Sequence, residues 1–344
     1  MAGATDTTMS QKIVCVGEVL LRLSQPGKEL LLQTPRLEAH IGGAEANVAV
    51  ALSKLGQTTA MASVLPDNSL GHAAAAELRR HGVDTSSIVW RDGRMGLYFL
   101  THGAGPRPAE VLYDRARSAF AEAPADSFDW PELLRSAAWL HVSGITPAVS
   151  ESGADLALRA MTTARAAGAS VSFDCNFRSR LWGDRAAQAP RLLSTLCEQA
   201  TLIFGEHRDI DFMLGTVPGE VANRQRHAAD RAFAAFKTLQ WMAHTDRTRT
   251  GADVQQLSAT LHARKESYTT RTHPLLGIVD RMGAGDAFAA GVLHGLIEGL
   301  SPPSVVEYGV AAACLKHTIP GDFNLIGRSD VELFLSDSQT DVRR

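Results

Sequence analysis

The sequence has no long hydrophobic run and no excess of basic charge. Each of these two absences excludes a class of protein. No stretch approaches the roughly 20 apolar residues that a membrane-spanning helix needs, so we expect no membrane segment. The formal net charge is -3, which gives no basic field for binding nucleic acid or an anionic membrane surface. We therefore expect the partners to be small molecules.

The sequence also has few cysteines, and its two ends have few apolar residues. The four cysteines lie far apart and form no Cys-x-x-Cys pair, which is typical of a reduced, cytoplasmic protein. Residues 1–11 are polar and lack the apolar core of a signal peptide, so we expect a flexible N-terminal tail, and a second tail at 336–344. The chain is 45% hydrophobic, which is enough for residues 12–335 to form one large α/β domain.

Short apolar runs alternate with amphipathic stretches from Lys12 onward, and many of these stretches end at a glycine. This alternation predicts β-α units on a mainly parallel sheet, in a three-layer α/β/α domain. The expected strands are 13–17, 59–64, 138–142, 170–174 and 202–204. The expected helices are 44–55, 73–81, 153–167, 285–298 and 303–316.

Two regions interrupt the alternation of strands and helices. Residues 20–40 and 96–117 carry β-forming residues and turn signals but no helical pattern. We expect them to pair into a small separate sheet, and such a sheet beside a large α/β layer can act as a lid over a ligand.

The most informative segment is Val-Asp-Arg-Met-Gly-Ala-Gly-Asp-Ala-Phe-Ala-Ala-Gly at residues 279–291. Three small residues, Gly283, Ala284 and Gly285, stand at the mouth of an expected helix, where free N–H groups and the helix dipole favour an anion. Asp286 would then stand beside an acceptor hydroxyl as general base. The alternative is a tight turn in which Asp286 only caps the helix.

This segment resembles the C-terminal signature of the ribokinase-like, or PfkB, carbohydrate kinases. A second stretch, Gly42-Gly43-Ala44-Glu45-Ala46-Asn47-Val48-Ala49, resembles the N-terminal signature of the same family. The resemblance implies ATP and Mg²⁺ as cosubstrate and cofactor, with Asp286 as catalytic base. It also implies that Gly42 and Gly43 let the backbone approach the sugar, that Asn47 binds sugar hydroxyls, and that Asp280 holds a monovalent cation such as K⁺.

The choice of substrate depends on positive charge. Arg22 stands where neutral-sugar kinases of the family usually carry an aspartate, and an arginine cannot accept hydrogen bonds from a diol. Two further segments, Tyr113-Asp114-Arg115 and Asp174-Cys175-Asn176-Phe177-Arg178, resemble motifs of 2-keto-3-deoxygluconate kinases. That resemblance implies a sugar acid held by a set of tyrosines and arginines: Tyr98, Tyr113, Arg115 and Arg178. The alternative is that the arginines form structural ion pairs.

One motif departs from the family pattern. Glu206-His207-Arg208-Asp209 stands where the family has Asn-x-x-Glu, and Glu206 and Asp209 lie at the i, i+3 spacing that places both carboxylates on one helix face. They could hold Mg²⁺ through its water shell. The resemblance also makes Arg247 a candidate contact of the ATP phosphates.

These observations predict phosphorylation of the terminal hydroxyl of 2-keto-3-deoxygluconate or a near relative by ATP. The family resemblance further implies a homodimer or a higher homo-oligomer. Two alternatives stay open: a kinase for a neutral sugar of the fructose or nucleoside type, and a non-catalytic sugar- or nucleotide-binding protein with a degraded Mg²⁺ site.

Overall fold

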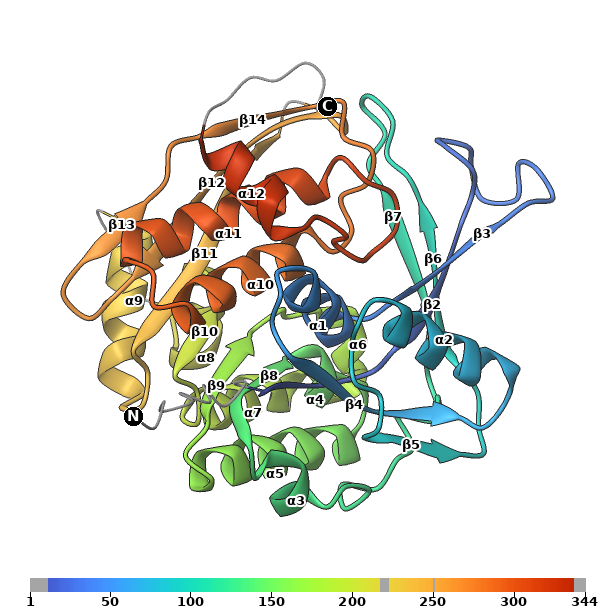
Figure 1. Ribbon diagram of the computed structural model, residues 1–344, viewed down its shortest axis with the longest axis horizontal. Helices are drawn as coiled ribbons and strands as arrows, with labels where there is room; N and C mark the ends of the chain where they lie inside the picture. The colour runs from blue at the N-terminus through green and yellow to red at the C-terminus, as the bar shows by residue number, and fades with distance from the viewer. Residues whose placement is uncertain (1–11, 217–222, 250, 337–344) are drawn as a thin grey trace, which may run out of the picture.

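The computed structural model describes residues 12–216, 223–249 and 251–336. The tail expected at 1–11 lies outside the described residues, and so does the tail expected at 336–344 except for its first residue. Within the described part, no helix combines the length and the apolar character that crossing a membrane requires. Two sheets organise the chain: a large one that passes through the centre of the molecule and a small one at its side (Figure 1).

The large sheet is mostly parallel, and β1 lies between β8 and β4. Its strands, in sheet order, are β13 (Ser267–Thr269), β12 (Val254–His262), β11 (Trp241–Arg249), β10 (Leu202–Phe204), β9 (Ser170–Asp174), β8 (Ala137–Ser143), β1 (Lys12–Val16), β4 (Thr59–Pro66) and β5 (Ile88–Arg91), with β14 (His273–Leu276) paired to β12. Only the pairs made by β12 are antiparallel, so the carboxyl ends of β1, β8, β9 and β10 share one edge.

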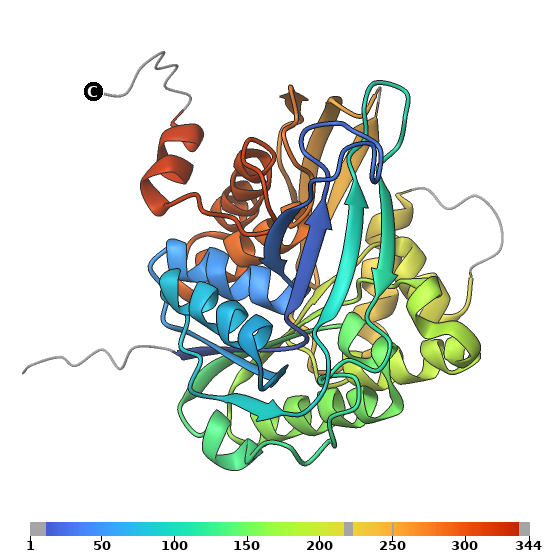
Figure 2. The same ribbon diagram turned by 90° about the vertical axis from the view of Figure 1, so that its right-hand side faces the viewer.

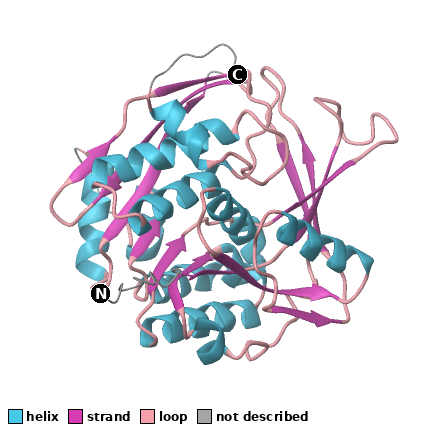
Figure 3. Ribbon diagram, viewed as in Figure 1, coloured by secondary structure: helices cyan, strands magenta, loops and turns pink. Residues whose placement is uncertain are grey.

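Helices cover both faces of this sheet, which confirms the expected three layers (Figure 3). Successive residues of a strand point to opposite faces, so Ile13 and Cys15 join one core cluster while Val14 and Val16 join the other. The first cluster includes α1 (Ala44–Lys54), α2 (Ser69–Arg80), α10 (Ala284–Ile297) and α11 (Pro302–Lys316). The second includes α3 (Trp130–Leu134), α5 (Glu151–Ala166), α7 (Ala189–Cys197), α8 (His207–Leu214) and α9 (Arg224–Ala235).

Shorter helices complete the described chain. They are α4 (Ile145–Val149), α6 (Ser179–Trp182), a 3₁₀ segment (Gly183–Gln188) and α12 (Arg328–Leu335). The expected helix 73–81 begins earlier, at Ser69, because the Asn68 side chain accepts hydrogen bonds from the N–H groups of Leu70 and Gly71 and so caps the helix.

The small sheet has the order β3-β2-β6-β7, as expected from the two regions without helical pattern. Its strands are β2 (Leu20–Ser24), β3 (Glu38–Gly42), β6 (Gly96–Thr101) and β7 (Glu110–Asp114). Figure 2 shows these strands extending across one side of the large domain. Because β2 leads out of β1 and β3 leads into α1, the small sheet stands beside the shared carboxyl edge of the large sheet.

Candidate active site

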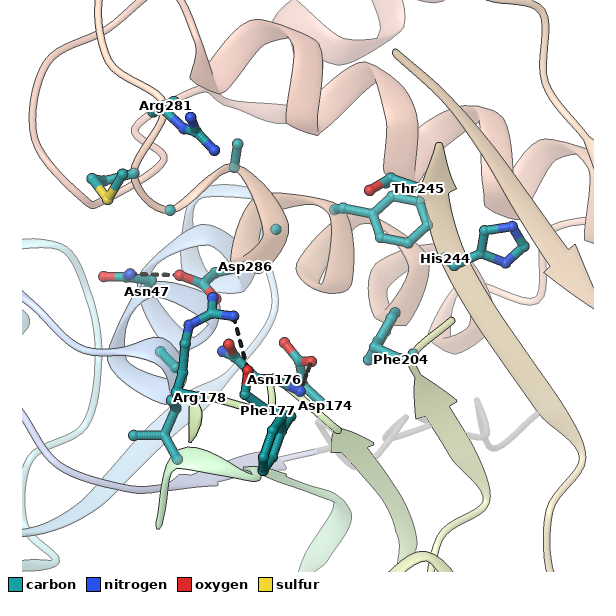
Figure 4. Close-up of a pocket in the computed structure, with 18 of the residues that line it drawn as sticks. Asn47, Asp174, Asn176, Phe177, Arg178, Phe204, His244, Thr245, Arg281 and Asp286 are labelled. Carbon is teal, nitrogen blue, oxygen red and sulfur yellow. Dashed lines mark hydrogen bonds between the residues drawn. The ribbon is translucent and has the colours of Figure 1, made fainter. Parts of the chain in front are cut away.

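A cavity of about 830 Å³ lies between the small sheet, the carboxyl ends of the parallel strands and the first turn of α10. Crevices outside the carboxyl ends of parallel strands are the usual ligand sites of open α/β sheets. The small sheet contributes Tyr98 and Tyr113, the carboxyl end of β9 contributes Asp174, and the segment after β10 contributes Glu206. Figure 4 shows the side chains that face one another across this cavity.

Asp286 stands in the first turn of α10 and lines the cavity, as the sequence predicts. Its Oδ2 accepts a hydrogen bond of 2.6 Å from Nδ2 of Asn47 on α1 (Figure 4). Burial raises the pKa of Asp286 to about 8, and the Asn47 bond lowers it less than burial raises it. Repulsion from Asp174, Asp322 and Glu45 adds to the rise. A carboxylate with so high a pKa is a strong proton acceptor.

The helix mouth beside Asp286 needs its small residues. Gly283 caps α10 at φ 75°, and a Cβ at this position would lie 1.9 Å from the backbone oxygen of Asp322. Only glycine fits both the left-handed backbone and this close approach. Gly283, Ala284 and Gly285 all line the cavity, and the first N–H groups of any helix lack intrahelical partners. The mouth can therefore receive an anionic group.

The paired glycines at the start of α1 serve close packing within the protein. A Cβ on Gly42 would lie 2.3 Å from Oδ2 of Asp322, and one on Gly43 would lie 2.3 Å from the backbone oxygen of Glu18. Gly43 also has φ 137° and lines the cavity, whereas Gly42 lies behind it. Asn47, expected to bind sugar hydroxyls, holds the Asp286 carboxylate with its amide nitrogen.

The arginines implicated in substrate choice have very different surroundings. Arg22 is 1% exposed, lies outside the cavity wall, and pairs with Asp280 and Asp322 at 2.7 Å each. The expectation that Arg22 selects an acidic substrate is therefore wrong. Arg115 lines the cavity, but its Nε donates to Oε2 of Glu18 at 2.8 Å and one terminal nitrogen donates to the same oxygen. Its positive charge is largely matched within the protein.

Arg178 differs from both. It follows β9, is exposed at the cavity wall, and forms no ion pair with any residue of the described chain; its one hydrogen bond, of 3.3 Å, goes to the Phe177 backbone oxygen. Figure 4 shows its guanidinium in the same cavity as Asp174 and Asp286. Burial raises the pKa of Asp174 to about 7, and Arg178 opposes that rise. Arg178 is thus a cation available to an anionic ligand.

Asp280 has partners other than the monovalent cation that the family resemblance implies. Its Oδ1 accepts from the N–H of Met282 at 3.0 Å, and its Oδ2 accepts from Arg22 at 2.7 Å and from the N–H of Gly321 at 3.1 Å. A positively charged side chain therefore lies where the resemblance suggests an ion.

Glu206 and Asp209 cap the start of α8 reciprocally. The Asp209 Oδ2 accepts from the Glu206 N–H at 2.8 Å, and the Glu206 backbone oxygen accepts from the Asp209 N–H at 3.0 Å. Both residues line the cavity. No group of three or more acidic, histidine or cysteine ligands suited to a metal is found within the described residues. Two carboxylates facing a cavity fit Mg²⁺ that keeps several waters and binds mainly to phosphate oxygens.

Further arginines gather at the other end of the cavity. Arg247 donates to Oε1 of Gln255 at 2.6 Å and lies 3.0 Å from Nε2 of His317, and burial lowers its pKa to about 10. Arg249 and Arg281 line the cavity too. Burial lowers the pKa of Arg281, and repulsion from Arg249 and Arg178 lowers it further. Such mutual repulsion marks a place where an anion is favoured.

Three residues that line the cavity were not predicted from the sequence as site residues: Asp174, Arg249 and Arg281. Arg281 had a signal, since it directly precedes Met282 and the three small residues of the helix mouth. Arg249 had none, because only the antiparallel pairing of β11 with β12 brings the end of β11 to the cavity.

A large parallel sheet with a small lid sheet, and a glycine-rich helix mouth next to a basic carboxylate, together define a kinase of small hydroxyl compounds. Comparison with known proteins agrees with this class. The model of the pfkB family of carbohydrate kinases matches residues 10–324, and the chain belongs to this family. It is accordingly an ATP-dependent carbohydrate kinase.

Individual relatives cover nearly the whole chain. A 2-dehydro-3-deoxygalactonokinase of Haloferax volcanii is 33% identical over 98% of this chain and 100% of its own. A 2-dehydro-3-deoxygluconokinase of Bacillus subtilis is 30% identical over 87% of this chain and 88% of its own. The crystal structure of a 2-dehydro-3-deoxygluconokinase from Thermotoga maritima is 36% identical, has a TM-score of 0.89, and covers 95% of this chain and 99% of its own.

Proposed function

We propose that the protein transfers the γ-phosphoryl group of ATP to the terminal hydroxyl of a 2-keto-3-deoxy sugar acid, with 2-keto-3-deoxygluconate as the first candidate and its galactonate epimer as the second. One observation carries this proposal: Asp286, at the mouth of α10, and Arg178, which has no ion pair within the described residues, line the same cavity. The names of the similar kinases support a keto-acid substrate.

In the proposed reaction, the substrate's terminal oxygen forms a bond to the γ-phosphorus. The bond from that phosphorus to the bridging oxygen breaks, and ADP leaves with the electron pair. The hydroxyl proton passes to the Asp286 carboxylate. The N–H groups at the mouth of α10 stabilise negative charge on the phosphoryl oxygens during transfer. Mg²⁺, when bound near Glu206 and Asp209, neutralises charge on the phosphates.

Arg178 gives the proposal its substrate class. A guanidinium matches a carboxylate with two parallel hydrogen bonds, and each charge-assisted bond is worth about 1.5 to 3 kcal/mol. Arg115 contributes less than the sequence indicates, because Glu18 already engages two of its nitrogens. We propose that Tyr98, Tyr113 and the remaining nitrogen of Arg115 complete the pocket around the sugar.

The test is ADP release measured with Mg·ATP against 2-keto-3-deoxygluconate, 2-keto-3-deoxygalactonate, fructose and ribose, with Asp286→Asn as the inactive control. Turnover confined to the two keto acids is the expected result, and their kcat/KM ratio assigns the epimer. Turnover on fructose or ribose alone would overturn the proposed substrate while leaving the kinase class intact.

A further inference from the structure

Arg22 is buried in the middle of lid strand β2, and its side chain donates to two carboxylates beside the mouth of α10. One terminal nitrogen donates to Oδ1 of Asp322 and the other to Oδ2 of Asp280, each at 2.7 Å. These partners lie 300 and 258 positions further along the chain. Arg22 therefore links the lid sheet to the segments that enter α10 and follow α11.

Asp280 connects two loops at the mouth of α10. Through Oδ1 it fixes the N–H of Met282, the residue before Gly283, and through Oδ2 it fixes the N–H of Gly321. Both N–H groups lie in loops. The conformation of the loop that leads into α10 therefore depends on the Asp280 carboxylate. The Arg22 guanidinium in turn fixes the position of that carboxylate.

Asp322 reaches the site from the other side. Its backbone oxygen packs against Gly283 so closely that no side chain would fit between them. Its Oδ2 accepts the hydroxyl of Tyr98, which lines the sugar end of the cavity. Asp322 thus contacts both the anion site and a predicted substrate-binding residue, and its Oδ1 is held by Arg22.

The charges of this network balance. Lys316 is also buried, donates to the backbone oxygen of Ile319 at 3.1 Å, and is attracted to Asp280 and Asp322. Two cationic side chains therefore face two carboxylates, which limits the large cost of burying them. Only a forked guanidinium can reach both carboxylates with separate nitrogens, and a lysine at position 22 would supply a single point charge.

We propose that Arg22 is a positioning residue for phosphoryl transfer, which acts through Asp280 and Asp322 to fix the mouth of α10 and Tyr98 relative to the lid sheet. Arg22 touches neither substrate. It instead makes the lid strand β2 and the anion site one rigid unit, so a sugar bound beneath the lid meets a preformed site. The proposal rests on the proposed function only in placing phosphoryl transfer at the mouth of α10.

The test compares Arg22→Lys and Arg22→Met with the wild-type protein, using whichever sugar the wild type phosphorylates. The control is Arg264→Met, which removes an arginine that donates to the backbone oxygens of Phe233, Lys237 and Leu239 and does not line the cavity. Readouts are kcat, both KM values, thermal melting, and hydrogen exchange of peptides covering 278–285 and 317–323.

We expect Arg22→Lys to remain folded at the assay temperature, with kcat lowered about 10- to 100-fold, because small misplacements of reacting groups have effects of this size. The KM for ATP should change by less than about threefold. The N–H groups of Met282 and Gly321 should exchange faster, while Arg264→Met changes neither kcat nor this exchange.

Two results would overturn the proposal. One is a folded Arg22→Lys protein with wild-type kcat and wild-type exchange. The other is loss of activity that follows unfolding alone, with both Arg22 variants melted at the assay temperature, which would assign Arg22 to stability. A wrong sugar assignment would leave this test unaffected, because the sugar is chosen by the wild-type panel.

Discussion

Replacing Asp286 by asparagine should abolish catalysis and at the same time stabilise the protein. The pKa of the Asp286 carboxyl is raised from 3.8 to about 8, mainly by burial and further by repulsion from Asp174, Asp322 and Glu45. Because the pKa of this group is higher in the folded than in the unfolded protein, the free energy of unfolding falls as the pH rises from the unfolded-state pKa to the folded-state pKa. Asparagine has the same shape, carries no charge, and can accept the Asn47 hydrogen bond through its amide oxygen.

The size of the expected stabilisation follows from the change in the pKa of Asp286. At about 1.4 kcal/mol per pH unit, a rise from 3.8 to about 8 corresponds to about 6 kcal/mol for a fully ionised, fully enclosed carboxyl. Asp286 opens onto the cavity, where solvent screens its charge. We therefore expect Asp286→Asn to gain about 1 to 3 kcal/mol at pH 8, which is roughly 2 to 6 °C in melting temperature.

The assay is thermal melting of wild type and Asp286→Asn at pH 5 and pH 8. The stability difference should be small at pH 5, where most of the wild-type carboxyl is protonated in the fold, and larger at pH 8. Asp155→Asn, at an exposed position on α5, is the matched control and should show no such trend. A variant that melts at or below the wild-type temperature at pH 8 would refute the electrostatic argument.

Four further outcomes are expected. First, kcat/KM should fall about tenfold per pH unit below pH 8, because the base must be ionised and its pKa is about 8; a flat profile between pH 6 and 8 would exclude Asp286 as the titrating base. Second, Arg178→Ala should raise the KM for the keto acid roughly 10- to 100-fold and leave the KM for ATP nearly unchanged, and an equal loss on a neutral ketose would contradict a carboxylate contact. Third, Arg281→Ala should lower kcat about 10- to 100-fold, since a cation beside the anion site stabilises transferred charge; unchanged kcat would place Arg281 outside the reaction. Fourth, Glu206→Asn should lower the KM for ATP most strongly at limiting Mg²⁺, and Mg²⁺ titration of both proteins would show no difference if Glu206 does not face the phosphates.

The sequence was sufficient for the fold because the signals that define it are local. Alternating apolar runs and glycine stops located β1, β4, β8, β9 and β10, which are five of the ten described strands of the large sheet, and the lack of helical pattern located the lid. The expected strands did not include the outer strands β5, β11, β12, β13 and β14. The helix α2 begins four residues before its predicted start, and Asn68, a residue type that favours helix N-caps, is the local signal for that earlier start. No comparable local signal exists for which side chains meet across the cavity.

The arginines show where prediction from sequence fails. Arg22, Arg115 and Arg178 all stand in motif-like contexts, but their roles depend on partners that are distant in the chain. Arg115 pairs with Glu18, which is 97 positions away in the sequence, and Arg22 pairs with Asp322, which is 300 positions away. Only the packing of the lid against the α10 mouth decides that Arg22 is an internal ion-pair residue while Arg178 stays open to a ligand. Residue type and spacing carry no information on that difference.

The charges around the cavity explain how the altered Glu206 motif is compatible with a nucleotide-binding site. Asp174, Glu206 and Asp286 line the same cavity, and in their ionised forms they oppose the binding of phosphates. Arg178, Arg249 and Arg281 enter the same cavity from separate segments and repel one another. A bound polyanion with Mg²⁺ would relieve that repulsion, because its phosphates would attract the arginines and the metal would offset the charge of Glu206. We therefore expect the complete Mg·ATP complex to bind this cavity more tightly than free ATP.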